Sequence, residues 1–152
     1  MKLADILKQE SVGIDLKSTE KDDVLKELVG LLGKGIKDRK KVVKALVDRE
    51  NLGSTGIGQG IAVPHGKMST IQHLVAALGI SKKGVDFNSL DGEPVYIFFL
   101  LIAPRDSAGP HLKALARISR ILRNASFCRI LRKAKDIDHM YNLIIKEDEK
   151  GN

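Results

Sequence analysis

Disulfide bonds, membrane spans and base-stacking surfaces all need residues that this sequence has in short supply. It contains one cysteine and no tryptophan in 152 residues, and 4% of its residues are aromatic. A lone cysteine, Cys128, forms no internal disulfide, which favours a reducing compartment. With so few aromatic rings, a platform on which nucleic-acid bases stack is hard to build.

Long apolar runs are missing as well. The longest, residues 95–103, has nine residues and would span about 14 Å as a helix, far short of a bilayer. Residues 1–5 already include an acid, and the apolar core of a secretory signal does not follow them. We therefore expect a cytoplasmic protein without membrane insertion.

What is present is the composition of an ordinary globular domain. The chain is 43% apolar and 30% charged, and at this length about 70% of the extended surface is buried on folding. One domain over residues 1–152 is predicted. The 26 Lys and Arg residues exceed the 19 Asp and Glu residues and give a net charge of +7, but acids are interleaved with them. A solvated basic face is therefore the preferred interpretation, with nucleic-acid binding as the weaker one.

The spacing of apolar residues predicts helices alternating with strands, which indicates the α/β class. Helices are expected from an N-cap at Ser18 or Thr19 to Gly33, over residues 38–50, from Pro110 to 122, and over 126–133 and 136–146, with a helical turn over 3–8. Strands are expected over residues 11–16, 61–63, 74–81 and 95–103. The last of these is apolar throughout, so we expect a central strand covered on both faces.

The helix that begins at Pro110 is predicted to be amphipathic. Its inward face is expected to carry Leu112, Leu115, Ile118 and Leu122. Basic residues recur on the opposite side at helical spacing and are expected to form an outward stripe of Lys113, Arg117, Arg120 and Arg123.

The glycine-rich loop over residues 53–60 does not match the common nucleotide-binding motifs. A P-loop needs Ser or Thr after its Gly-Lys pair, but Met68 follows Gly66 and Lys67. A dinucleotide fingerprint that begins at Gly56 would need a third glycine where Ile61 stands.

The glycine loop leads instead to a histidine. Pro64 restricts the residue before it to an extended conformation, so residues 61–63 are expected to form a short strand that delivers His65 at its end. A neutral imidazole is a competent nucleophile at pH 7. Other groups that could converge on it are His111 at a helix start, Arg49 at a helix end, and the hydroxyl groups of Ser54 and Thr55. From spacing alone, a histidine in a tight turn is an equally good interpretation.

Two longer motifs decide between these interpretations. Residues 49–66, R-E-N-L-G-S-T-G-I-G-Q-G-I-A-V-P-H-G, closely resemble the active-site signature of fructose/mannitol-type IIA domains of the bacterial phosphoenolpyruvate:sugar phosphotransferase system (PTS). Residues 110–119, P-H-L-K-A-L-A-R-I-S, resemble that family's second histidine motif. The similarity covers nearly the whole chain and implies one PTS IIA type-2 domain, with a mixed β-sheet flanked by helices on both faces.

The resemblance also implies a chemistry. His65 would accept a phosphoryl group on Nε2 from an HPr-type phosphocarrier, His111 would orient that group, and Arg49 would neutralise its charge. Ser54, Thr55 and Gly66 are further candidates for phosphate binding. The family needs no metal and no cofactor. Because the four histidines and one cysteine lack zinc-ligand spacing, we expect no metal site. His73 and His139 are expected on the surface, and Cys128 is expected to be a small buried residue.

The family contains nitrogen-regulatory and sugar-uptake members, and the stand-alone regulatory proteins are the more similar. Because the chain ends at Asn152 without room for a further domain, the regulatory type is expected. Such a protein would control a transporter or kinase through its phosphorylation state, with the basic stripe as a docking face or an ordinary solvated surface. One alternative is a fructose/mannitol uptake component that passes phosphate to a IIB domain. The other is a nucleic-acid-binding module without relay activity.

Overall fold

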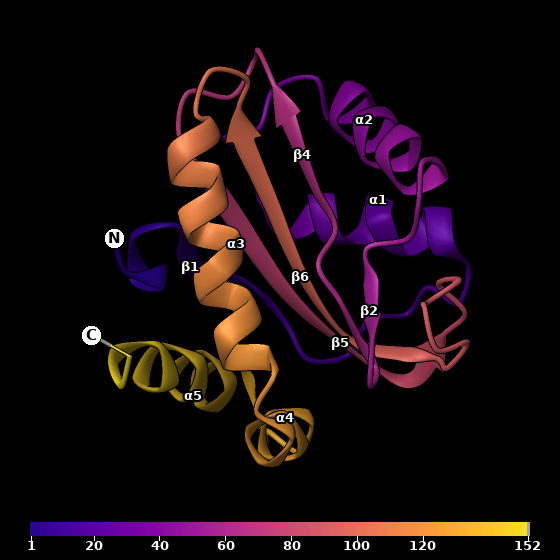
Figure 1. The fold of residues 1–152 in the computed structure, drawn as a ribbon, viewed down its shortest axis with the longest axis vertical. Coiled ribbons are helices and arrows are strands. Elements are labelled where there is room, and N and C mark those ends of the chain that lie inside the picture. Colours follow the sequence, from indigo (N-terminus) through magenta and orange to yellow (C-terminus); the bar gives the residue numbers. More distant parts are fainter. Residues whose placement is uncertain (152) are drawn as a thin grey trace.

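A mixed β-sheet of six strands forms the centre of the computed structural model, which describes residues 1–151 (Figure 1). The strands are β1 (Leu7–Gly13), β2 (Gly56–Gly58), β3 (Ile61–Ala62), β4 (His65–Met68), β5 (Val75–Val85) and β6 (Val95–Pro104). Their order is β1-β5-β6-β3-β2, and β4 pairs with β6 beyond the end of β3. β5 and β6 are antiparallel, whereas β1 is parallel to β5, and β3 and β4 are parallel to β6.

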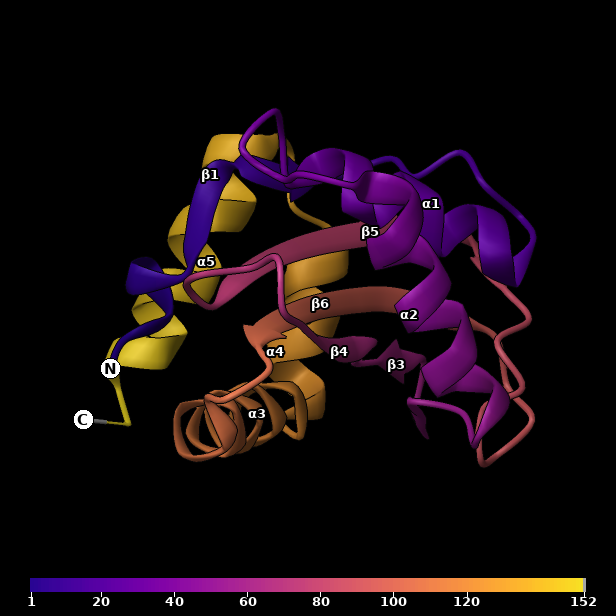
Figure 2. The same cartoon turned by 90° about the horizontal axis from the view of Figure 1, so that it is seen from above.

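Helices cover both faces of the sheet. They are α1 (Lys21–Leu31), α2 (Arg39–Asn51), α3 (Ala108–Leu122), α4 (Ala125–Arg132) and α5 (Ile137–Glu149), with a 3-10 turn η1 (Leu3–Asp5) at the start. α1 and α2 pack on one face and α3 to α5 on the other, as Figure 2 shows from above. This confirms the predicted α/β class and the predicted helices on both faces. Asn152, the predicted end of the domain, lies outside the described residues.

The central strand β6 explains why its sequence is apolar without interruption. Ile97, Phe99 and Leu101 belong to the core on the α3 side. Phe98, Leu100 and Ile102 belong to the core on the α1 side. All six are at most 1% exposed, and burying each side chain contributes about 1.5–3 kcal/mol. The predicted central strand is confirmed.

Several predicted boundaries are wrong. β1 begins at Leu7 rather than at residue 11, because exposed polar residues in this edge strand hide its alternation. Helix α1 has Glu20 at its N-cap, and Ser18 instead donates its hydroxyl hydrogen to Glu27 at 2.7 Å. Pro110 is the third residue of α3, because the helix already begins after Ser107.

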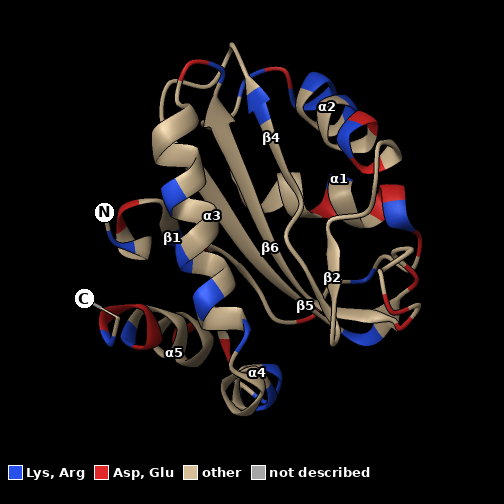
Figure 3. Cartoon of the chain, in the orientation of Figure 1, with Lys and Arg blue, Asp and Glu red and all other residues tan. Residues whose placement is uncertain are grey.

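The predicted inward face of α3 is wrong at one of its four residues. Ile118 and Leu122 are buried as predicted, and Leu115 packs partly buried against the core. Leu112 is 70% exposed, and the residues that face the core are His111, Ala114, Ile118, Ile121 and Leu122. In the first turns of α3 the core position is occupied by His111, and a count of apolar residues overlooks a buried histidine. Arg117, predicted to point outward, donates from Nε to the buried Asp148 at 2.7 Å. Figure 3 shows the basic residues along α3 and around α4. Within the described residues, no helix has the length and apolar character that crossing a membrane requires.

Candidate active site

Two histidines that are far apart in the sequence meet beside the central strand. His65 is the first residue of β4, whose partner on β6 is Leu101, and His111 lies in the first turns of α3. β6 pairs with β4, and α3 begins shortly after β6 ends. His111, near the start of α3, therefore lies close to His65 on β4. The ring centroids are 5.6 Å apart, at an interplanar angle of 73°. The prediction placed His65 at the end of β3, and the structure places it at the start of the next strand along the same edge.

The backbone fixes which nitrogen of His65 is free to react. Its Nδ1 lies 2.8 Å from the carbonyl oxygen of Val63. A carbonyl oxygen only accepts hydrogen bonds, so Nδ1 carries the proton and donates it. In a neutral imidazole the other nitrogen, Nε2, then holds a lone pair. The ring is half-buried, which leaves Nε2 as a nucleophile at the surface of the domain.

His111 is buried and incompletely bonded. It is 5% exposed, and its Nε2 has no hydrogen-bond partner among the described residues. Burial lowers the pKa of His111 below its ordinary value, and the charges of His65 and Lys67 lower it further. The ring is therefore neutral at pH 7. A buried ring nitrogen without a partner is costly, and a polar group bound beside it would remove that cost.

Both histidines line a cavity of about 450 Å³ between the end of α2, β4 and the start of α3. Its lining residues are Ala45, Arg49, His65, Gly66, Lys67, Ala108, His111, Leu112 and Leu115. Arg49 comes from the last turn of α2, and its Nη1 donates to the carbonyl oxygen of Gly53 at 2.8 Å. The structure thus brings together four of the residues predicted for the site: Arg49, His65, Gly66 and His111.

Lys67 is a cavity residue that sequence reasoning missed. It lies two positions after His65 on β4, and residues at that spacing share one face of a strand. It adds a second cation beside Arg49. The period-two alternation after His65 was the signal that could have found it.

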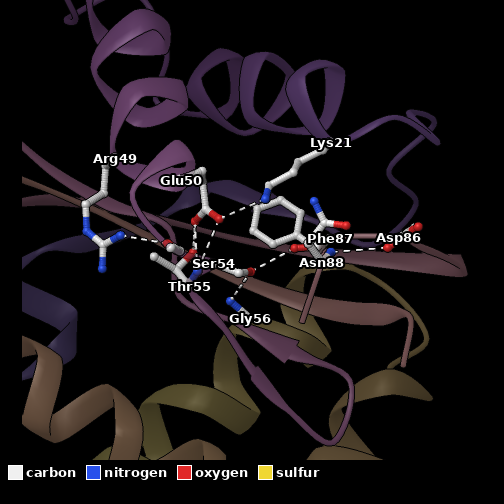
Figure 4. A network of polar contacts seen from close by, with 10 residues as sticks. Lys21, Arg49, Glu50, Ser54, Thr55, Gly56, Asp86, Phe87 and Asn88 are labelled. Atoms are coloured by element: carbon white, nitrogen blue, oxygen red, sulfur yellow. Dashed lines mark hydrogen bonds and ion pairs between the residues drawn. The ribbon is translucent and has the colours of Figure 1, made fainter. Parts of the chain in front are cut away.

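Ser54 and Thr55 are not among the residues that line the cavity. Ser54 Oγ donates to the carbonyl oxygen of Phe87 at 2.8 Å and accepts from the Gly56 amide at 3.0 Å. The hydroxyl group of Thr55 donates to the Glu50 carboxylate, which also accepts from the Thr55 amide at 3.1 Å (Figure 4). Both hydroxyl groups hold the glycine loop in place, and their contact with phosphate stays a prediction.

Glu50 anchors this loop to helix α2. It is 4% exposed, and beyond Thr55 it pairs with Lys21 Nζ at 3.3 Å. Lys21 in turn lies over the Phe87 ring, 4.8 Å from its centroid. Figure 4 shows Arg49 and Glu50 leaving adjacent positions of α2 in different directions, with Glu50 directed toward Lys21 and Thr55. The loop and the arginine are therefore positioned by the same helix end.

The cysteine and the two remaining histidines lie where they were expected. Cys128 is 7% exposed, and its Sγ donates to the Leu122 carbonyl oxygen. Burial raises the pKa of its thiol to about 11, so it is not a nucleophile at pH 7. His73 and His139 are exposed. Among residues 1–151 there is no group of three or more side chains able to hold a metal ion.

Comparisons with known proteins agree with this geometry. The family model described as "Phosphoenolpyruvate-dependent sugar phosphotransferase system, EIIA 2" matches residues 5–147. The chain is 35% identical over 148 residues to a nitrogen regulatory protein of Bradyrhizobium diazoefficiens, with 95% of each chain covered. It is also 35% identical over 151 residues to the fructose-specific EIIABC component of Bacillus subtilis, covering 98% of this chain but only 24% of that protein.

The fold of this chain also matches that of a relative whose structure is solved. The crystal structure of the nitrogen regulatory protein IIA-Ntr from Neisseria meningitidis matches with a TM-score of 0.88 and 27% identity, covering 93% of this chain and 98% of that one. The chain therefore belongs to the EIIA type-2 family of the phosphoenolpyruvate-dependent sugar phosphotransferase system, whose members are phosphotransferase components that carry the phosphoryl group on a histidine.

Proposed function

We propose that Nε2 of His65 accepts a phosphoryl group from an HPr-type phosphocarrier and holds it as phosphohistidine. The observation that carries this proposal is the hydrogen bond from Nδ1 to the Val63 carbonyl oxygen, which leaves Nε2 as the free nitrogen. Its lone pair attacks the phosphorus atom of the phosphorylated carrier. The bond between phosphorus and the carrier's nitrogen breaks, and that nitrogen keeps the electron pair. Nδ1 of His65 retains its proton throughout, bonded to Val63.

The other cavity residues supply what this transfer needs. Phosphoryl transfer depends mainly on positioning and on positive charge around the equatorial oxygens. Arg49 offers paired N–H donors and Lys67 a further positive charge, and both line the cavity with His65. The unpartnered Nε2 of His111 is the group in this cavity for which a phosphoryl oxygen would supply the missing hydrogen-bond partner. Gly66 follows His65 on β4 and also lines the cavity.

We assign the chain to the regulatory branch of the family, as one domain acting in the cytoplasm. Domains of this family interact with phosphocarriers and IIB partners. For this chain we propose that the phosphorylation state decides the docking of a regulated transporter or kinase. Phosphorylation adds about 1.5 to 2 negative charges beside Arg49 and Lys67, which cancels most of their positive charge. The close match to IIA-Ntr favours regulation, while the equal identity to a fructose component keeps sugar uptake as the alternative.

The relay is tested by intact mass after incubation with phosphoenolpyruvate, enzyme I and an HPr-type carrier. The wild-type chain is expected to gain one acid-labile phosphoryl group, and His65→Ala none. His73→Ala, which removes an exposed histidine outside the cavity, is the matched control and should gain the group. A phosphoryl group on His65→Ala would overturn the proposal. Rapid transfer from the wild-type protein to a fructose- or mannitol-type IIB domain would favour sugar uptake over regulation.

A further inference from the structure

A second cleft, of about 360 Å³, lies where the end of α4 meets β5. It is lined by Ile80, Ser81, Lys82, Arg129, Arg132 and Lys133 and shares no lining residue with the His65 cavity. Four of these six side chains are cations, contributed by two elements that are distant in the sequence.

All four of these cationic side chains are exposed. None of them takes part in an ion pair between residues 1 and 151. The Asp15 carboxylate forms its ion pair with Lys17, at 2.6 Å, and that bond lowers the pKa of Asp15. The positive charge of Lys82 lowers this pKa further, without a direct ion pair. The C-terminal end of a helix attracts cations with about half a negative charge, which accounts for a small part of the four. The cleft therefore retains a positive charge that an anion would balance.

Two of the cations are held by contacts with neighbouring side chains. The Arg132 guanidinium lies over the Tyr96 ring, with its Cζ 3.8 Å from the ring centroid. That ring fits because its neighbours are glycines: a Cβ at Gly84 would lie 2.8 Å from the ring, and Gly84 has a φ of +86°. Arg129 Nη2 donates to Ser126 Oγ at 3.1 Å. Side chains that are already ordered lose less entropy when a ligand binds.

We propose that this cleft binds a small oligophosphate, a molecule that carries two or more linked phosphate groups. Guanidinium groups recognise phosphate oxygens through paired N–H donors, and four cations exceed what a single phosphate neutralises. The cleft is concave and falls in the size range of small-molecule sites, whereas a nucleic-acid duplex needs an extended basic surface.

The site is separate from the relay. Tyr96 lies five residues before Leu101, the partner of His65 on β6, a separation of about 17 Å along the strand. A bound oligophosphate therefore leaves His65 open to its phosphocarrier. For the same reason, binding in this cleft is expected to be unchanged in His65→Ala, so the two proposals fail independently.

Isothermal titration calorimetry with inorganic tripolyphosphate, at fixed ionic strength, tests the proposal. We expect one equivalent to bind, about tenfold or more tightly than orthophosphate. Arg132→Gln and Lys82→Gln should each weaken binding about tenfold, because each removes a charged hydrogen-bond donor. Lys146→Gln makes the same charge change at an exposed position on α5 and should alter the affinity less than twofold. The unfolding midpoint of each variant, measured alongside, confirms that it is folded.

Three results would overturn the proposal. They are the absence of one-to-one binding of tripolyphosphate by the folded wild-type protein, an equal loss in Lys146→Gln, and an affinity that the cleft variants leave unchanged. A duplex DNA fragment is titrated in parallel. If the cleft variants weaken DNA binding but leave tripolyphosphate binding intact, the cleft belongs to a nucleic-acid surface.

Discussion

An imidazole ring offers two nitrogens, and a hydrogen bond to one of them decides which can react. In this chain the deciding group is a backbone carbonyl two residues away: Val63 accepts from Nδ1 of His65. Pro64 restricts Val63 to an extended conformation and so helps to set this carbonyl. The selection of Nε2 is therefore local, whereas its surroundings, His111 and Arg49, come from distant segments.

At the residue scale, the two histidines are expected to differ in their effects. His111→Ala should still become phosphorylated on His65, because the nucleophile is intact. It should pass the phosphoryl group on, to unphosphorylated carrier or a IIB domain, about a hundredfold more slowly, the usual cost of losing one positioned donor. His111→Gln keeps a side-chain N–H and should recover part of that rate. Quench-flow transfer assays measure this, and failure of His111→Ala to accept phosphate would contradict the assignment of roles.

The lowered pKa of His111 predicts a pH dependence of stability. Unfolding returns the pKa of this ring to its ordinary value of 6.5. Below pH 6.5 the unfolded chain then binds more protons than the folded one, so the free energy of unfolding falls as the pH falls toward the lower folded-state value. Well above pH 6.5 both states bind no proton at this ring, so the residue contributes no slope there. Urea titrations between pH 5 and 8 should show a flatter profile for His111→Gln, and parallel profiles would contradict the prediction.

At the scale of elements, the end of α2 serves two purposes with adjacent residues. Arg49 faces the cavity while Glu50 holds the glycine loop through Thr55 and pairs with Lys21. The conformation of the glycine loop therefore depends on its contacts with helix α2, which also carries Arg49. The loop is not held by its glycines alone.

Removing the Glu50 carboxylate is expected to loosen this element. Glu50→Ala leaves the Thr55 amide and Lys21 without their acceptor and should lower the free energy of unfolding by about 2 to 3 kcal/mol. Glu50→Gln keeps an acceptor oxygen and should lose about 1 kcal/mol. Asp48→Ala, on an exposed side of the same helix, breaks only a surface pair with Lys44 and should change stability by less than about 0.5 kcal/mol. Equal effects at both positions, measured by urea unfolding, would refute the anchoring role.

Elements with one strong pattern were predictable from the sequence, and those with mixed patterns were not. The apolar run of β6 predicted a central strand, and α2 was located to within about a residue. The exposure of Leu112 was missed because the polar His111, and not its apolar neighbour, occupies the core position. In the site, motif resemblance found Arg49, His65 and His111, but their convergence depends on how β4 and α3 pack. The role of Glu50 was missed because its partners are visible only in the folded chain.

At the scale of the whole molecule, a buried carboxylate joins both ends of the chain. Asp148 on α5 is 1% exposed and accepts from the Leu3 amide at 2.8 Å. It also accepts from Arg117 on α3 and lies 3.7 Å from Arg120 Nη2. The first and last elements are thereby fixed to the helix that carries His111.

Neutralising this carboxylate is expected to destabilise the whole domain. Asp148→Asn removes the buried charge that accepts from the Arg117 guanidinium and the Leu3 amide, and should lower the free energy of unfolding by about 2 to 3 kcal/mol. Glu147→Gln, one position earlier, affects a pair with the exposed Lys150 and should cost less than about 1 kcal/mol. Chemical denaturation of both variants measures the difference. A loss in Asp148→Asn no larger than that in Glu147→Gln would show that this contact is dispensable.

The position of the phosphoryl group on the histidine ring is the most direct test of the account. It is measured on the phosphorylated protein, labelled with ¹⁵N, from the ring nitrogen chemical shifts and their couplings to phosphorus. The Nδ1 bond to Val63 predicts phosphorus on Nε2 of His65 alone, with Nδ1 still protonated. Phosphorus on Nδ1 of His65, or on any other histidine, would contradict the central claim.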